Sequence, residues 1–157
     1  MAPRVAFKEW AVICAALAAG RQSLILRKGG IAEHGGEFRP EHERFLLLPT
    51  YFHEHRFGIK SDLLPLLERC EAEKHEPGTL RFTHEATVQS VDHLVDLDRV
   101  LALDAEHGWT AEEVTKRFHY RKPGVFAIRV AVVALPEPLI VPERPEYAGC
   151  RTWVELG

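Results

Sequence analysis

The sequence predicts an α+β fold, with a single domain over residues 1–157 in which three or four helices pack on a mixed β-sheet. The length of 157 residues is that of one ordinary domain. Hydrophobic residues make up 46% and charged residues 27%, a balance that excludes collagen-like, low-complexity and largely disordered chains. Helical and strand-like segments also alternate without a regular β-α-β rhythm, which favours a mixed sheet over a doubly wound one.

Four elements are predicted in the N-terminal third of the chain. In order they are a helix over 6–19, a strand over 22–28, a polar loop over 31–43 and a strand over 44–48. The helix is expected to end at Gly20, because glycine adopts the left-handed conformation that closes many helices. The two strands are apolar runs that end at Gly29 and Pro49.

The rest of the chain predicts three helices, two strands and an extended tail. In order they are an amphipathic helix over 59–74, an alternating strand over 80–88, helices over 94–105 and 110–118, a strand over 124–135, and a proline-rich segment over 136–157 with a last strand over 152–156. Ser61 or Asp62 would cap the first helix, and Thr110 with Glu113 forms a capping box. The strand over 124–135 is apolar on both faces apart from Arg129, so we expect it to be central.

The charge balance and the cysteines limit the class of protein. Twenty Lys and Arg stand against 23 Asp and Glu, which argues against indiscriminate DNA binding and leaves room for a local basic site. Three cysteines, far apart and without a CxxC spacing, are typical of free thiols, so we expect a cytoplasmic protein. No run approaches the roughly 20 apolar residues of a membrane span, and the N-terminus lacks a signal-peptide pattern.

Arg27-Lys28-Gly29-Gly30 is a candidate anion site. Two cations stand beside a glycine pair, which lets a backbone approach a phosphate closely while the cations pair with it. The spacing and the Ser/Thr of a P-loop are missing. The alternative interpretation is a tight turn with solvated cations.

A second candidate site follows the strand over 44–48. His53 and His55 flank Glu54, so they are weak candidates for metal ligands on one side of an extended segment, although a third ligand is missing. His53 could instead act as a general acid or base, or hold the loop by hydrogen bonds. Thr50 lies in the same stretch, and His42 is a plausible additional member.

Aromatic and basic residues near polar loops could bind nucleic acid. Tyr51, Trp109 and Tyr120 are candidates for base stacking. Basic residues cluster with aromatic ones from Arg117 to Lys122, a segment that includes Arg121. The alternative interpretation is that these cations stabilise the C-terminus of a helix.

Four separated motifs match a known family in order. They are Phe7-Lys8-Glu9-Trp10-Ala11, then Leu26-Arg27-Lys28-Gly29-Gly30-Ile31, then His42 with Phe45-Leu46-Leu47-Leu48-Pro49-Thr50 and His53, and last Gly149-Cys150-Arg151 with Trp153-Val154. On these motifs the chain resembles, over nearly its whole length, the uncharacterised prokaryotic family called domain of unknown function 1802. Glu54 departs from the family pattern, which has Gln there. The resemblance implies no assigned activity. Some relatives are joined to a restriction-type nuclease domain, which implies a recognition or accessory role in restriction-modification or defence, beside a nuclease partner.

A second resemblance concerns the fold. The segment Gly20-Arg21-Gln22-Ser23, followed by a strand that ends in Leu26-Arg27, is similar to the opening of ASCH and PUA-like domains. Those domains are small β-barrels with flanking helices that bind RNA or modified bases. The resemblance therefore implies a barrel-like sheet as one form of the expected fold.

Three function classes follow from these features. The leading hypothesis is a binding module for DNA, RNA or a nucleotide-like ligand, with a site lined by Arg27, Lys28, His42, Thr50 and His53 and supported by Lys8 and Arg121. The alternative is a small hydrolase, in which Lys28 or His53 is the base, Glu37 or Glu54 its partner carboxylate, and Thr50 an orienting group or nucleophile. The third class is a protein-interaction subunit that docks through its proline-rich tail. No cofactor is required by the sequence, and the oligomeric state stays open.

Overall fold

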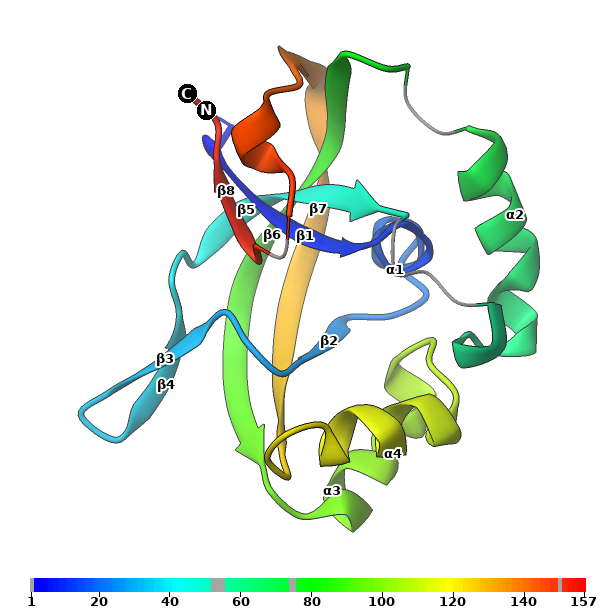
Figure 1. Cartoon of the computed structure of the whole chain (residues 1–157), viewed down its shortest axis with the longest axis vertical. Helices are drawn as coiled ribbons and strands as arrows, with labels where there is room; N and C mark the ends of the chain where they lie inside the picture. Colours follow the sequence, from blue (N-terminus) through cyan, green and yellow to red (C-terminus); the bar gives the residue numbers. More distant parts are fainter. Residues whose placement is uncertain (1, 52–55, 74–75, 150) are drawn as a thin grey trace.

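The computed structural model describes residues 2–51, 56–73, 76–149 and 151–157. Six strands form one mixed sheet in the order β2-β7-β6-β5-β1-β8, and β3 pairs with β4 in a separate hairpin (Figure 1). The strands are β1 (Val5–Trp10), β2 (Leu24–Arg27), β3 (Ile31–His34), β4 (Glu37–Pro40), β5 (Arg44–Thr50), β6 (Thr79–Leu94), β7 (Val125–Pro142) and β8 (Trp153–Glu155). The helices are α1 (Ala11–Ala18), α2 (Leu64–Ala72), α3 (Leu97–Leu101) and α4 (Ala111–His119). The predicted α+β class with a mixed sheet is confirmed, and β2 and β8 are the edges of a sheet that does not close within the described residues.

The first half of the predicted helix over 6–19 is wrong. Val5–Trp10 forms β1, which pairs in parallel with β5 and antiparallel with β8, and the helix begins only at Ala11. Tertiary pairing overrides the helical spacing of Phe7 and Trp10, because a strand buried on both faces shows no clean alternation. This correction places Lys8 and Glu9 in β1, between β5 and the edge strand β8 in the strand order.

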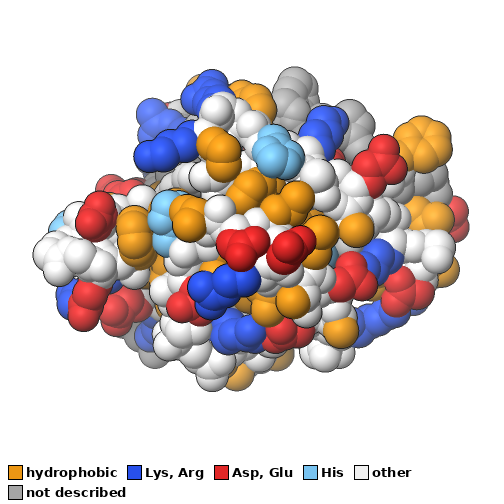
Figure 2. All heavy atoms as spheres, turned by 90° about the horizontal axis from the view of Figure 1, so that it is seen from below, with side chains coloured by type: hydrophobic (Ala, Val, Ile, Leu, Met, Phe, Trp, Pro, Cys, Tyr) orange, Lys and Arg blue, Asp and Glu red, His pale blue; other side chains and the backbone are white. Residues whose placement is uncertain are grey.

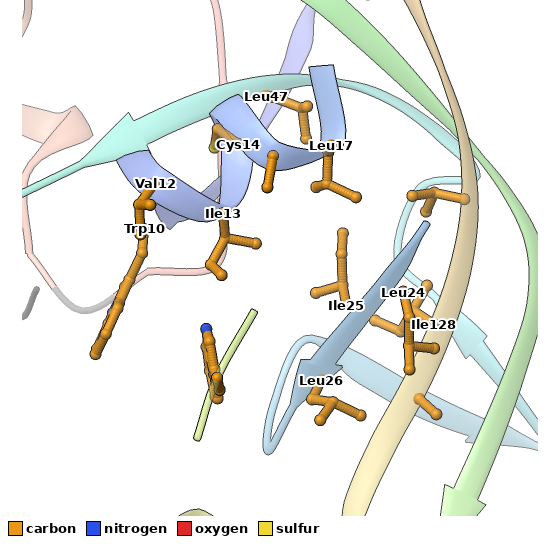
Figure 3. Packing of buried hydrophobic residues seen from close by; sticks show 14 of the residues in the cluster. Trp10, Val12, Ile13, Cys14, Leu17, Leu24, Ile25, Leu26, Leu47 and Ile128 are labelled. Atoms are coloured by element: carbon orange, nitrogen blue, oxygen red, sulfur yellow. The ribbon is translucent and has the colours of Figure 1, made fainter. Parts of the chain in front are cut away.

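Two hydrophobic clusters lie on opposite faces of β1 and β5. Phe7, Phe45 and Leu47 belong to one cluster, and their neighbours Ala6 and Leu46 belong to the other, as the two-residue period of a strand requires. Helix α1 covers the first cluster. Its Ile13 and Leu17 point toward Ile25 of β2 (Figure 3).

The two long strands β6 and β7 extend beyond their predicted ends. Their pairing runs from Thr79 opposite Pro142 to Leu94 opposite Val125, with register shifts at Phe82/His84 and at Val88/Ser90. Much of the expected proline-rich tail is therefore the end of β7. The shift at Phe82/His84 lies opposite Pro136 and Pro138, which lack the N–H of a regular ladder, and Pro142 lies at the last pair, opposite Thr79.

Other boundaries differ from the predictions for local reasons. The predicted loop over 31–43 contains the β3–β4 hairpin, whose turn is made by Gly35 and Gly36 at φ 58° and 86°. Leu63, and neither Ser61 nor Asp62, is the N-cap residue of α2. The helix expected over 94–105 is reduced to α3 and a short 3-10 turn, because β6 continues to Leu94. The cap of α4 is confirmed, since Thr110 Oγ1 accepts from the Glu113 N–H.

Different helices pack at the two ends of the sheet. Helices α3 and α4 lie together below the long strands, and α2 packs beside α1 (Figure 1). The predicted last strand is confirmed as β8, where the Leu156 N–H donates to the Arg4 carbonyl and brings the termini side by side. Across the described ranges, no helix is long and apolar enough to cross a membrane.

Candidate functional site

The candidate site lies where the ends of β1, β2 and β5 meet α4. Trp10 pairs with Thr50 at the ends of the parallel strands β1 and β5, and Thr50 Oγ1 donates to the Glu9 carbonyl at 3.2 Å. Arg27, the last residue of β2, donates through Nη1 to the Lys8 carbonyl at 3.1 Å. The backbone of β1 therefore joins three strand ends at one point.

Glu9 is a buried carboxyl group at this junction. Its side chain is 1% exposed, and Oε1 accepts from the Trp10 N–H at 2.8 Å. Oε2 lies 3.8 Å from Arg27 Nη1, which is close enough for attraction but too long for a hydrogen bond. Burial raises the pKa of Glu9, against the opposing effects of Arg27, the Trp10 N–H and Arg117.

Arg27 links the junction to β8. Its Nη2 donates to Thr152 Oγ1 at 3.0 Å, and its guanidinium lies 4.9 Å from the ring centroid of Phe7. Gly30 packs against the same threonine: a Cβ at Gly30 would lie 2.6 Å from a Thr152 side-chain carbon. Because φ is also +84° there, this second glycine of the predicted anion motif is required by packing and by backbone conformation.

Lys28, the residue after β2, lies in a cradle of backbone carbonyls. Its Nζ donates to the carbonyls of Phe118, Lys122 and Gly124 at 2.5 to 3.1 Å. These groups belong to the last turn of α4 and the segment after it, where carbonyls lack helical partners. Burial lowers the pKa of Lys28. All three ammonium donors are used, so Lys28 supports the site mainly through its charge and by holding α4.

Arg117 of α4 is stacked between two indoles. Its guanidinium carbon lies 3.3 Å from the ring centroid of Trp109 and 4.7 Å from that of Trp10. Burial lowers the pKa of Arg117 to about 10, although Glu9 and Glu113 favour its charged form. Its buried Nε has no hydrogen-bond partner, and among the described residues no acceptor binds its guanidinium. Arg117 is therefore a cation held by aromatic stacking with hydrogen-bond donors to spare.

Three cations and one indole surround a single small cavity, which we call the cationic cavity. Its volume is about 10 Å³. It is lined by Leu26, Arg27, Lys28, Trp109, Val114, Arg117 and Val125. On the face seen from the α3–α4 end, acidic and basic side chains are interspersed (Figure 2). Attraction for an anion is therefore local to the cavity.

The structure brings some of the predicted site residues together and separates others. Lys8, Arg27, Lys28 and Thr50 gather around the junction and the cationic cavity. Lys8 itself donates to the Gly149 carbonyl at 2.9 Å. His53, Glu54 and His55 lie outside the described residues.

Three other predicted residues lie apart from the cationic cavity or are paired elsewhere. His42 packs its ring edge-on against Trp153, with the two ring centroids 5.3 Å apart. Arg121 is exposed with φ 60°, and its guanidinium lies 5.1 Å from the Tyr120 ring. Glu37, the partner carboxylate of the hydrolase alternative, lies on β4 and pairs with Arg39 at 2.6 Å. In the described ranges, no group of three metal-ligating side chains is found.

Sequence reasoning missed Glu9 and gave Arg117 only a place in a surface cluster. The error at Glu9 follows from assigning residues 6–10 to a helix, which turned the carboxylate away from the core. A usable signal exists in Phe7 and Trp10, because a charged pair between two large aromatic residues on a short apolar segment is typical of a strand with a buried polar group.

Comparison with known proteins identifies the family. The family model described as Domain of unknown function (DUF1802) matches residues 6–157. The chain belongs to this DUF1802 family. No curated protein matches it.

Solved structures show which fold the DUF1802 chain shares. ASCH from Zymomonas mobilis is 10% identical, with a TM-score of 0.55, and the match covers 98% of this chain and 87% of that one. A tyrosine-to-phenylalanine mutant of that protein has 10% identity, a TM-score of 0.54, and coverage of 98% and 89%. At this identity the likeness shows the fold, and the predicted ASCH-like architecture is confirmed.

Proposed function

We propose that this DUF1802 protein is a binding module for a phosphate-bearing, nucleotide-like ligand or a nucleic-acid strand. The cationic cavity is the proposed phosphate site, and the indole of Trp109 is the proposed stacking surface. Arg27 and Arg117 supply the hydrogen-bond donors. Lys28 contributes charge and holds α4 in place.

The stacked guanidinium of Arg117 is the observation that carries the proposal. The buried Nε of Arg117 has no acceptor, which is costly because this donor loses water and gains no hydrogen bond in return. An oxyanion at the cavity would accept from Arg117 and Arg27 together, in the two-donor geometry that suits phosphate. The cavity of about 10 Å³ would have to widen by movement of the partly exposed arginines.

The family resemblance supports a biological setting for this binding. We propose that the protein acts in the cytoplasm as a recognition or accessory part of a restriction-modification or defence system, beside a nuclease partner. The predicted ligand residues His42, His53 and Arg121 would then contact parts of a strand beyond the phosphate. These roles stay predictions.

A binding assay with matched variants tests the proposal. Nucleoside monophosphates and fluorescently labelled single-stranded RNA and DNA would be titrated against wild type, Arg117→Ala and Arg99→Ala. Arg99 is an exposed arginine on α3 and serves as the control. We expect Arg117→Ala to weaken binding by about 10- to 100-fold, the loss of one or two charged hydrogen bonds, and Arg99→Ala to bind like wild type.

Two results would contradict the proposal. One is that a folded Arg117→Ala variant and a folded Arg27→Ala variant both bind like wild type. The other is that no member of the panel binds. Turnover of a bound nucleotide would instead move the assignment to the hydrolase class.

A further inference from the structure

We infer that a second small cavity, enclosed by Glu9, Gln22, His107 and Trp109, is a binding site for one ordered water molecule. This cavity shares the lining residues Leu26 and Trp109 with the cationic cavity, and we call it the acceptor cavity. Its volume is also about 10 Å³, close to the space that a single water needs. The inference is independent of the proposed function.

Two buried acceptors line the acceptor cavity without a protein partner. Glu9 is 2% exposed and Gln22 is 8% exposed. Glu9 Oε2 and Gln22 Oε1 are both fully enclosed and accept no hydrogen bond from a described residue. Leaving two such oxygens unpaired is costly, so a donor that reaches both would stabilise the native state.

The orientation of Gln22 follows from its other hydrogen bond. Its Nε2 donates to the Leu24 carbonyl at 2.9 Å, so the amide cannot be flipped without placing two acceptors together. The wall behind Oε1 is also close-packed, since a Cβ at Gly108 would lie 3.2 Å from this oxygen. Gln22 Oε1 is therefore a fixed acceptor.

His107 supplies the complementary donor. Its Nδ1 accepts from the Trp109 N–H at 3.1 Å, which assigns the remaining proton of the neutral ring to Nε2. A water in the acceptor cavity would accept from His107 Nε2 and donate to Glu9 Oε2 and Gln22 Oε1. These three hydrogen bonds are the typical number for a buried water. An ammonium ion has the same size and could donate to the two oxygens, but it cannot accept from His107.

A high-resolution crystal structure of the full chain tests the inference directly. We expect one isolated peak in the acceptor cavity, roughly 2.7–3.2 Å from Glu9 Oε2, Gln22 Oε1 and His107 Nε2. A dry cavity, or side chains of Glu9 and Gln22 re-paired with protein donors, would overturn it.

Solution measurements distinguish a bound water from a bound ammonium ion and from a dry cavity. Gln22→Met removes the acceptor Oε1, together with the Nε2 donor to the Leu24 carbonyl, at similar volume. Gln89→Met changes the same residue type at an exposed position of β6. We expect the first variant to lower the Tm by roughly 2–4 °C and the second to leave it unchanged. Equal Tm values for Gln22→Met and wild type would overturn the inference. So would a higher Tm in ammonium sulfate than in sodium sulfate at equal ionic strength that Gln22→Met abolishes, because it would assign the site to ammonium.

Discussion

The two cavities that Trp109 lines differ in their unpaired polar groups: donors are unpaired in one and acceptors in the other. The cationic cavity is lined by Arg27, Lys28 and Arg117, and the acceptor cavity by Glu9, Gln22 and His107. On the acceptor side the unpaired groups are oxygens on almost fully buried residues. On the cationic side Arg27 and Arg117 are only partly buried, and Arg117 keeps unused donors. Two cavities of equal volume are thus suited to different occupants.

The difference follows from depth and from charge. The unpaired oxygens of the acceptor cavity belong to almost fully buried residues, and a water molecule is small enough to reach them. A site bordered by partly exposed arginines can be completed by an anion that arrives from solution. The acceptor side is therefore expected to govern stability, and the cationic side to govern binding.

Removing the shared wall should have the largest effect. Trp109 is 3% exposed and contributes to both cavities, so Trp109→Ala would join them and remove the stacking partner of Arg117. We expect the free energy of unfolding to fall by about 3–5 kcal/mol. Urea unfolding followed by circular dichroism would measure this. Trp109→Phe keeps part of the wall and should lose less. If the free energy of unfolding of Trp109→Ala falls by less than about 1 kcal/mol, Trp109 is not the wall that the two cavities share.

The second largest expected effect is a loss of stability in acid, through His107 of the acceptor cavity. Burial, with Lys60 nearby, lowers the pKa of His107 from 6.5 to about 4, against the opposing effects of Asp104 and Glu106. The unfolded chain therefore binds this proton more readily, so the stabilisation is complete above pH 6.5 and is lost as the pH falls toward 4. The difference corresponds to about 3 kcal/mol.

The variant His107→Asn tests this pH dependence. Its Oδ1 can still accept from the Trp109 N–H, but the side chain does not titrate. Unfolding free energies measured from pH 7 to pH 4 should fall less steeply for His107→Asn than for wild type. His34→Asn, at an exposed position of β3, should keep the wild-type slope. Parallel curves for wild type and His107→Asn would contradict the assignment.

Lys28 is the one cation expected to matter mainly for stability. Lys28→Met would leave the carbonyls of Phe118, Lys122 and Gly124 to water, and we expect a loss of about 2 kcal/mol. Lys116→Met, at an exposed position of α4, is the matched control and should change stability little. Thermal unfolding would measure both. If the two variants unfold at the same temperature, the carbonyl cradle does not hold α4.

Local sequence signals predicted much of the fold. Apolar runs ended by Gly29 and Pro49 located β2 and β5, and the Thr110 cap located α4. The signals failed where long-range pairing decides the conformation: residues 5–10 became a strand because β5 and β8 flank them. Pro136 and Pro138 stayed in β7 because a register shift lies opposite them, and Pro142 is at the last pair of the strand.

The candidate site was predictable only in part. Arg27 and Lys28 were identified because their motif is local. Glu9 and Arg117 meet only through the packing of β1 against α4, more than a hundred residues apart, and no short-range pattern encodes that contact. Gly30 of the predicted anion motif is explained by its contact with Thr152 and by its positive φ.

Substitution of Arg117 should change stability least, whereas substitution of Lys28 should lower it clearly. Stacking on Trp109 contributes about 1 kcal/mol, and burial of the charge opposes it, as the pKa lowered to about 10 indicates. Arg117→Met keeps apolar contact with both indoles, so we expect an unfolding free energy within about 1 kcal/mol of wild type. The same variant should bind the nucleotide panel about 10- to 100-fold more weakly. A loss of stability as large as that of Lys28→Met would make the stack structural, and it would remove the physical distinction between the two cavities that Trp109 lines.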